Sequence, residues 1–384
     1  MHKVFSNSIY KGSTLFTRTS GGSVCKRDYV TKKEKKIKNI LSSAESGIGD
    51  DKKYVDVEYS SYEIHKPVLI KEVLRALNPT PGGIYIDTTF GLGGHTRAIL
   101  DSCKDCYVIA IDRDSNVFDL TKDLRSKYKD RLITLQGNFS NLSTLLSENK
   151  LDKLEISGIL YDFGVSSYQI DSSDRGFSYR KELEGPLDMR MNNQSNHSMT
   201  ASNVLNTFSE KSLRDIFFVY GEEKHTKSIA SEIVKRRVNE PLLMTSQLVN
   251  VVESCMPYPA ASKTISRIFR ALRMFVNDEI GEIKKGLHQG ELLLKEGSPL
   301  VAISFHSIED RILKRYLQRG VNPEKYGDES EALYLPSFDP HPLYGSGAPV
   351  YPSPEELKWN PRSESAILRT AIRNSNPPLP FKDI

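Results

Sequence analysis

Glycines and acidic residues follow two apolar segments at a spacing that suits the binding of a nucleoside. Residues 84–87 lead into the turn Gly91-Leu92-Gly93-Gly94-His95, and residues 107–111 lead into Asp112. In a βα unit such a turn places backbone N–H groups and a helix N-terminus against a ligand. Glycines permit positive φ and leave no Cβ in the way. A carboxylate such as Asp112 can accept hydrogen bonds from both ribose hydroxyls. Turn and acid together therefore predict a nucleoside-cofactor site.

Two further segments follow predicted strands. Phe139, in Gly137-Asn138-Phe139, could cover an adenine or be a core residue, and Asp162 opens the run Asp162-Phe163-Gly164-Val165-Ser166-Ser167-Tyr168-Gln169. Asp112 could also cap a helix and Asp162 could simply form a turn. A doubly wound fold brings the carboxyl ends of parallel strands to one edge. We therefore expect all four segments to meet there.

The glycine turn discriminates between cofactors. A dinucleotide-binding loop needs a third glycine in G-x-G-x-x-G, where this chain has Thr96, and a phosphate loop needs a Gly-Lys-Ser/Thr ending, which is absent. S-adenosylmethionine needs no pyrophosphate site. It needs a close turn for its amino-acid part, a ribose carboxylate and an adenine slot. That set is present, so we predict S-adenosylmethionine as the cofactor.

Strand and helix patterns alternate along the chain and predict an α/β fold with a parallel, doubly wound sheet. The alternation stops over 171–263, where only helical patterns such as 210–237 and 245–255 occur, and resumes with a helix near 263–288. The simplest explanation is a sheet domain (51–170 and 264–384) with an inserted helical domain (171–263). The predicted helices of the sheet domain are 69–77, 94–102, 115–127 and 263–288, and its strands are 84–87, 107–111, 132–135, 157–161, 300–305 and 366–373.

The N-terminal segment differs in charge from the rest of the chain. Residues 1–40 carry a net charge of +8 and the remaining residues −4. Residues 1–27 are rich in Ser, Thr, Lys and Arg, contain no acid and lack a long apolar core, a composition typical of a mitochondrial transit peptide. A disordered basic tail is the alternative. We predict that residues 1–50 are a transit peptide and a disordered basic extension, and that the mature protein is in the mitochondrial matrix.

Neither a metal site nor a membrane segment is predicted. The chain has four cysteines, and the CxxC pair Cys103 and Cys106 has no second Cys/His pair nearby to complete a tetrahedral zinc site. No apolar run approaches the ~20 residues of a membrane span.

Nine motifs, found in order over about residues 62–375, resemble those of the bacterial methyltransferases that act on N4 of a cytosine in small-subunit ribosomal RNA. The N-terminal extension is similar to that of the mitochondrial branch of this family. The motifs are His65-Lys66-Pro67-Val68-Leu69, Gly91-Leu92-Gly93-Gly94-His95, Asp162 to Gln169, Arg175-Gly176-Phe177-Ser178, Gly185-Pro186-Leu187-Asp188-Met189-Arg190-Met191, Tyr220-Gly221-Glu222-Glu223, Ala271 to Glu279, Ser304 to Arg311 and Asn360-Pro361-Arg362-Ser363.

The resemblance implies a Rossmann-type methyltransferase with S-adenosylmethionine as cofactor and a helical insertion that recognises the substrate. It also implies small-subunit ribosomal RNA as partner, within a partly or fully assembled mitochondrial small subunit, and a part in ribosome biogenesis. By position, the cofactor contacts are Gly93, Gly94, His95, Asp112, Phe139, Asp162 and Gln169.

Two residues are candidates for the chemistry of methyl transfer. Asp162 follows the fourth strand, where many amino-methyltransferases have an Asp/Asn-Pro-Pro-aromatic motif, and could orient the amine or accept its proton. His306 follows the fifth strand and could line the target pocket, although a structural role is also open. RNA could contact Arg175, Arg180, Lys181, Arg190 and the arginines at 267, 270 and 273. The alternatives are a ribosome-assembly factor without turnover and a DNA cytosine methyltransferase, the latter disfavoured by the missing Pro-Pro.

Overall fold

The computed structural model describes residues 66–194, 198–257, 259–318, 337–344, 348–378 and 381. Seven strands within these ranges form one sheet in the order β3-β2-β1-β4-β5-β7-β6. β1 to β5 are parallel, whereas β7 runs antiparallel to both β5 and β6. The strands are β1 Ile84–Asp87, β2 Tyr107–Asp112, β3 Leu132–Gln136, β4 Gly158–Asp162, β5 Pro299–Ser304, β6 Phe338–Asp339 and β7 Ile367–Arg373.

The strands are short and apolar because both faces of the sheet are covered. One core contains Ile86 and Ile109 with side chains of α6, α13 and α14, and the other contains Tyr85 and Val108 with side chains of α2, α3 and α5. A strand buried on both faces reads as a continuous apolar run. Strand order reverses between β1 and β4, where such folds bind ligands. The flanking helices are α2 Ile70–Leu77, α3 Gly94–Ser102, α4 Asn116–Leu120, α5 Lys122–Tyr128, α6 Leu142–Glu148, α13 Glu279–Leu293, α14 Ser307–Gln318 and α16 Pro354–Trp359.

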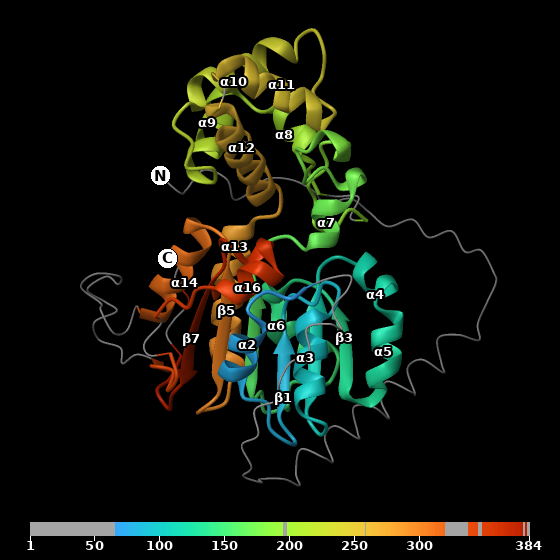
Figure 1. Cartoon of the computed structure of the whole chain (residues 1–384), viewed down its shortest axis with the longest axis vertical. Helices are drawn as coiled ribbons and strands as arrows, with labels where there is room; N and C mark the ends of the chain where they lie inside the picture. The colour runs from blue at the N-terminus through green and yellow to red at the C-terminus, as the bar shows by residue number, and fades with distance from the viewer. Residues whose placement is uncertain are drawn as a thin grey trace, which may run out of the picture.

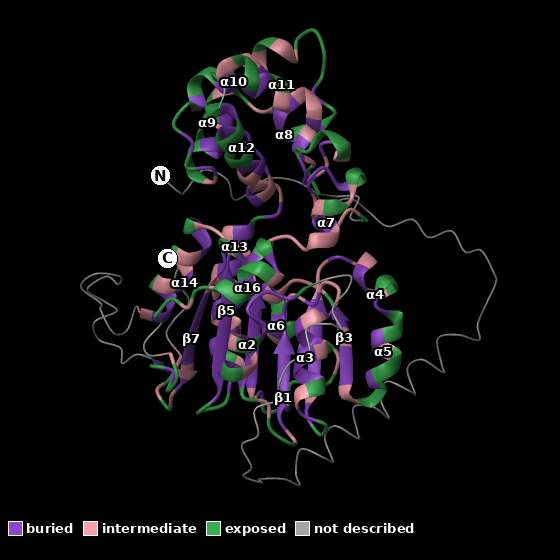
Figure 2. Cartoon of the chain, viewed as in Figure 1, coloured by how far each residue is buried: buried purple, intermediate pink, exposed green. Residues whose placement is uncertain are grey.

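Five helices form a separate group beyond the carboxyl ends of the central strands (Figure 1). They share a third hydrophobic core that includes Phe217, Ile229 and Leu248. Figure 2 shows their buried faces turned toward one another and their outer faces exposed. The short helix α7 (Ser167–Asp171) leads from the sheet toward this group. The helices are α8 Ala201–Thr207, α9 Glu210–Val219, α10 Thr226–Arg236, α11 Thr245–Cys255 and α12 Ala260–Val276.

Three predicted helices are each broken in two in the structure. The break between α12 and α13 has Asp278 at φ 48, a left-handed conformation. The break between α9 and α10 has Glu222 at φ 51. α4 ends at Thr121, whose hydroxyl bonds the carbonyl of Val117. Side chains along most of α12, from Ala261 to Leu272, belong to the helical core, which therefore continues beyond residue 263.

The structure confirms the predicted fold class, an α/β doubly wound sheet carrying an additional group of helices. The predicted transit peptide and basic extension lie outside the described residues. Within the described residues, no helix is long and apolar enough to cross a membrane.

Candidate functional site

A cavity of about 390 Å³ opens at the carboxyl edge of the sheet. Its wall contains residues that follow each of the five parallel strands, together with the start of α13, as expected for a doubly wound fold. The predicted site residues in the wall are Gly94, His95, Asp112, Phe139, Asp162 and Gln169. Gly93 and His306 are not among the residues that line it.

Gly93 acts through the backbone conformation of the turn. It precedes α3 at φ 77, and a Cβ built on it would lie 2.2 Å from Leu124 Cδ2 and 2.9 Å from Phe90 Cε2. A Cβ on Gly94 would lie 3.0 Å from Pro67 Cβ. Glycine at 93 therefore lets the turn close over Phe90 and directs the N-terminus of α3 toward the cavity.

Gly93→Ala is expected to destabilise the protein more than Gly297→Ala does. Both glycines have positive φ, 77 and 80, but nothing lies within 4 Å of a Cβ on Gly297. The control carries backbone strain of about 1 kcal/mol, whereas Gly93→Ala adds a steric clash of roughly 1–3 kcal/mol. Denaturant unfolding measures the difference. Equal losses of stability in the two variants would contradict the role assigned to the Gly93 contact.

Asp112 is tied to the glycine turn. Its Oδ2 accepts a hydrogen bond from the Gly91 amide at 2.7 Å, and its Oδ1 accepts one from the Asp114 amide at 2.8 Å. Burial raises the pKa of Asp112 to about 6, which these two amides partly offset. The two bonds fix the carboxylate at the cavity wall, and each oxygen keeps a lone pair for a ribose hydroxyl.

Phe139 belongs to a cluster of aromatic side chains beside the cavity. Its ring centroid lies 5.8 Å from that of Tyr161 and 6.2 Å from that of Phe163. A Cβ on Gly286 of α13 would lie 2.3 Å from Phe139 Cδ2, so this glycine permits the close approach of helix and ring. Phe139 packs against the core and also lines the cavity, and its contact with adenine stays a prediction. An aromatic ring at a cavity wall can stack against a flat base such as adenine.

Asp162 and His95 are neighbours in the cavity wall. Asp162 Oδ2 lies 3.7 Å from His95 Nδ1, and the buried Oδ1 has no hydrogen-bond partner among the described residues. Burial, with Asp87 and Glu309 nearby, raises the pKa of Asp162 well above its ordinary value. Burial lowers the pKa of His95 to about 4, and its Nε2 lies 2.9 Å from the Val68 carbonyl oxygen. His95 is therefore neutral at pH 7, and no Lys or Arg side chain among the described residues forms an ion pair with Asp162.

His306 belongs to a charged cluster at the end of β5. Its Nε2 lies 2.9 Å from Glu309 Oε1, and Arg273 forms two 2.7 Å hydrogen bonds to Glu279. Burial raises the pKa of Glu309, but His306 and Arg273 outweigh it and hold the pKa below its ordinary value. His306 thus orients Glu309 from behind the cavity wall, and its catalytic role stays a prediction.

The same cluster contains metal-ligand types. Ligand atoms of Glu279, His306 and Glu309 lie within 4.8 Å of one another. However, Arg273 bonds both oxygens of Glu279 and lies 3.7 Å from Glu309 Oε1. A guanidinium already supplies the positive charge that a metal would bring. The donor set therefore does not favour a cation.

The model of the MraW methylase family matches residues 62–374 of this chain. The chain belongs to this family. It is similar to proteins named Ribosomal RNA small subunit methyltransferase H. That of Granulibacter bethesdensis is 40% identical over 316 residues, covering 81% of this chain and 92% of the relative. That of Brucella canis is 41% identical over 320 residues, covering 82% and 89%.

Solved structures show a more distant likeness. A rRNA methylase from Streptococcus thermophilus is 9% identical and covers 80% of this chain and 94% of its own, with a TM-score of 0.33. NSun6 from Pyrococcus horikoshii is 11% identical and covers 81% of this chain and 53% of its own, with a TM-score of 0.39.

S-adenosylmethionine is the cofactor of this methylase, and the cavity has a place for each of its parts. The glycine turn and His95 suit the amino-acid part, Asp112 the ribose and Phe139 the adenine. The Asp162 carboxyl lines the same site, where the positive charge of a bound sulfonium would favour its ionised form. The contacts of the individual residues stay predictions by position in the family motifs.

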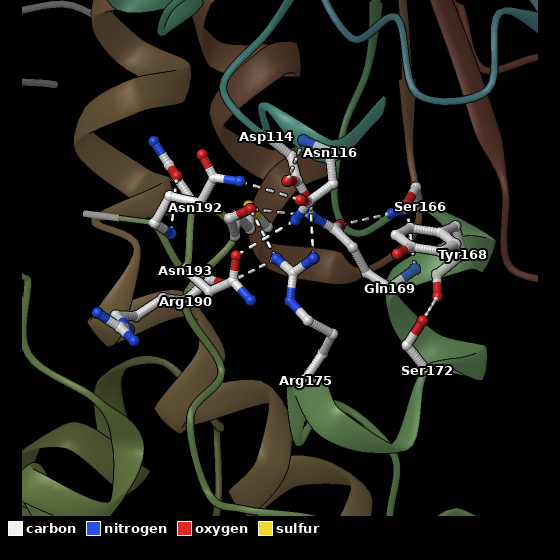
Figure 3. Close-up of polar contacts among 12 residues, drawn as sticks. Asp114, Asn116, Ser166, Tyr168, Gln169, Ser172, Arg175, Arg190, Asn192 and Asn193 are labelled. Carbon is white, nitrogen blue, oxygen red and sulfur yellow. Dashed lines mark hydrogen bonds and ion pairs between the residues drawn. The ribbon is translucent and has the colours of Figure 1, made fainter. Parts of the chain in front are cut away.

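A buried network that the sequence interpretation missed joins the cofactor side of the cavity to the segment leading into the helices. Asp114 Oδ2 accepts hydrogen bonds from Gln169 Nε2 at 2.9 Å and Arg175 Nη1 at 2.8 Å (Figure 3). Arg175 Nη2 donates to the carbonyls of Arg190 and Met191 at 3.0 and 2.8 Å. Asp114 lies two residues after the predicted ribose acid, which is the only sequence signal for its role.

Two residues predicted to contact ligands, Gln169 and Arg175, belong to this buried network. Gln169 lines the cavity, yet its amide bonds Asp114, Met191 and the Ser166 N–H, so it positions the wall as well as facing the ligand. Arg175 is 1% exposed and cannot reach RNA. Its expected contact with RNA is therefore wrong.

The other predicted RNA-binding arginines differ in accessibility. Arg190 forms an ion pair with Asp188, and Arg270 donates to the Gly221 carbonyl. Arg267 is half exposed and lies 3.4 Å from Glu223. Arg180, which lines the cavity, and Lys181 are exposed and suit contact with a polyanion.

Proposed function

We propose that this methylase transfers the methyl group of S-adenosylmethionine to N4 of a cytosine in small-subunit ribosomal RNA. The names of its relatives support the RNA substrate, and the motif resemblance supports the cytosine N4. The single structural observation that carries the proposal is the position of Asp162. One oxygen of its carboxylate is buried and has no hydrogen-bond partner among the described residues, and the side chain lines the same cavity as the cofactor turn.

Bound S-adenosylmethionine supplies a methyl group activated by the positively charged sulfur. The cytosine amine is a weak nucleophile because its lone pair is conjugated into the ring. The chain's main contribution is therefore to hold N4 in line with the methyl–sulfur bond, which can supply roughly 7–11 kcal/mol. The glycine turn and Asp112 fix one partner, and the wall beyond Asp162 fixes the other.

Asp162 completes the proton balance. The N4–carbon bond forms as the carbon–sulfur bond breaks, and the nitrogen becomes positively charged unless it releases a proton. The ionised Asp162 carboxylate accepts that proton, because its side chain lines the cavity and is 21% exposed there. The products are the methylated amine, a neutral thioether and a protonated Asp162. No further co-reactant is required.

The target cytosine must leave its stack to enter the cavity, at a cost of a few kcal/mol. The helical group suits this step, because it lies beyond the carboxyl ends of the central strands (Figure 1) and Arg273 of its helix α12 lines the cavity. Beyond residue 40 the chain has a net charge of −4, which favours modest affinity for free RNA. We therefore propose the partly or fully assembled mitochondrial small subunit as the substrate, with a part in ribosome biogenesis in the matrix.

A direct test maps N4-methylcytidine in mitochondrial small-subunit ribosomal RNA with and without the gene product. Loss of one methylated cytosine, restored by the wild-type chain but not by Asp162→Asn, is the expected result. An unchanged map would contradict the proposal and favour an assembly factor without turnover.

Import of a reporter fused to residues 1–50 tests the proposed location, and a reporter that stays in the cytosol would contradict it.

A further inference from the structure

Arg273 is held rigidly in the wall of the cavity. Its Nε and Nη2 each donate a 2.7 Å hydrogen bond to Glu279, and Nη2 lies 3.7 Å from Glu309 Oε1. Burial lowers the pKa of Arg273, but the two carboxylates outweigh this and raise it above its ordinary value. A bidentate fork leaves the guanidinium little freedom to rotate. Its side chain is 15% exposed.

The remaining nitrogen of this guanidinium, Nη1, makes no hydrogen bond with any described residue. It faces Gly164, two residues after Asp162. A Cβ built on Gly164 would lie 4.0 Å from Nη1 and 3.8 Å from Glu309 Oε1, and no atom outside its neighbours is closer. Gly164 has φ 100, so a side chain is disfavoured at this position. The open space between the loop and Arg273 belongs to the cavity that Asp162 lines.

Asp162 and Arg273 therefore border one cavity with opposite hydrogen-bonding character, an acceptor on one side and a fixed donor on the other. Cytosine has the matching pattern, because its N4 donates and its O2 accepts. Phe305, which lines the same cavity, offers an apolar surface for the ring. We propose that Arg273 is a specificity-determining residue whose Nη1 donates to O2 of the target cytosine while Asp162 faces N4. This inference rests on the proposed function and assigns its base recognition.

The arrangement rejects uracil for two reasons. Uracil has an oxygen where cytosine has N4, which places an acceptor against the Asp162 carboxylate. Its N3 carries a hydrogen, which faces the donor side of the wall. When the wrong base leaves buried polar groups of a site without hydrogen-bond partners, the site strongly favours the correct base over it. An arginine that only held an RNA phosphate would not distinguish the two bases.

The test combines a protein change with a change in the base. Small subunits are reconstituted with cytidine or with 2-thiocytidine, a weaker acceptor at position 2, at the target nucleotide. Single-turnover methyl transfer is measured for the wild-type enzyme and for Arg273→Lys, which keeps the charge but loses the fork. For the wild type, we expect the sulfur to slow transfer on the order of tenfold. For Arg273→Lys, whose rate on cytidine is already reduced, we expect the same substitution to have less than about a twofold effect.

An equal effect of the sulfur in both proteins would overturn the proposal, because it would mean that Arg273 does not contact O2. S-adenosylhomocysteine binding by calorimetry shows whether the variant is folded. If Arg273→Lys fails this check, the double variant Arg273→Gln/Glu279→Gln, which leaves no unpaired charge at this fork, is measured in its place. Failure of the proposed function gives a different result, because the wild type would then not methylate the cytidine substrate at all.

Discussion

Replacing Asp162 by Asn is expected to lower the single-turnover rate of methyl transfer by about 10²- to 10⁴-fold, far more than any loss of affinity for S-adenosylhomocysteine. The amide keeps the size of the side chain but cannot accept the N4 proton. Rapid-quench transfer to reconstituted small subunits measures the rate, and calorimetry with S-adenosylhomocysteine measures binding. Asp130→Asn, at an exposed position away from the cavity, is the matched control and should behave as the wild type.

The pH dependence gives the Asp162 prediction a second readout. Because only the ionised carboxylate accepts a proton and its pKa is raised well above the ordinary value, the wild-type rate should increase with pH through the raised pKa. The Asn variant should not show this increase. A wild-type rate in Asp162→Asn, or the same pH profile in both proteins, would contradict the role of Asp162.

The stability of the same variant should change in the opposite direction to its activity. A carboxyl with a raised pKa binds its proton more tightly in the native state than in the unfolded state. Its stabilising contribution is complete below pH ~4 and is lost as pH increases toward the raised value. Asp162→Asn avoids this loss. The variant should therefore unfold at higher denaturant concentration than the wild type at pH 7–8, and the difference should shrink toward pH 4.

The strands and the cofactor turn could be predicted from the sequence because their signals are local. A strand buried on both faces has a continuous apolar run, and a turn that needs positive φ at Gly93 leaves glycine in the sequence. The helix breaks could not be predicted in this way. Asp278 takes up a left-handed conformation, and Asn277 beside it holds the Met191 N–H and the Met189 carbonyl. Those partners are more than 80 residues away in the chain.

The charged residues of the site show the same limit. Arg175 was expected on the surface, since arginine is almost never fully buried unless it is paired. Its partner Asp114 lies 61 positions earlier in the sequence, and nothing local marks the two as a pair. Arg273, with Arg267 and Arg270, is spaced as part of a basic helix face. In the structure, Glu279 and Glu309 hold it in the cavity wall. Spacing identifies which residues reach the sheet edge, but the partner of each charge depends on packing between segments distant in sequence.

The Arg175–Asp114 pair is expected to have the largest effect on stability. Both side chains are buried, at 1% and 0% exposure, and removing one partner leaves a buried charge without compensation. Arg175→Met should therefore lower the free energy of unfolding by about 3–5 kcal/mol. Arg362→Met is the matched control, because it removes an Arg–Asp ion pair with Asp171 in which both side chains are about half exposed. The control should lose no more than about 1 kcal/mol.

The double variant separates a true ion pair from simple loss of packing. Asp114→Asn alone leaves Arg175 buried without its counter-ion, whereas Arg175→Met/Asp114→Asn leaves no charge, and the amide oxygen introduced at position 114 could still accept from Gln169. The double variant should be clearly more stable than the sum of the two single losses predicts, when all four proteins are compared by denaturant unfolding. Strict additivity would show that the charges do not interact. In that case the connection between the cofactor side of the cavity and the 175–191 segment would depend on the carbonyl contacts of Arg175 and on Gln169, which bonds the Met191 carbonyl.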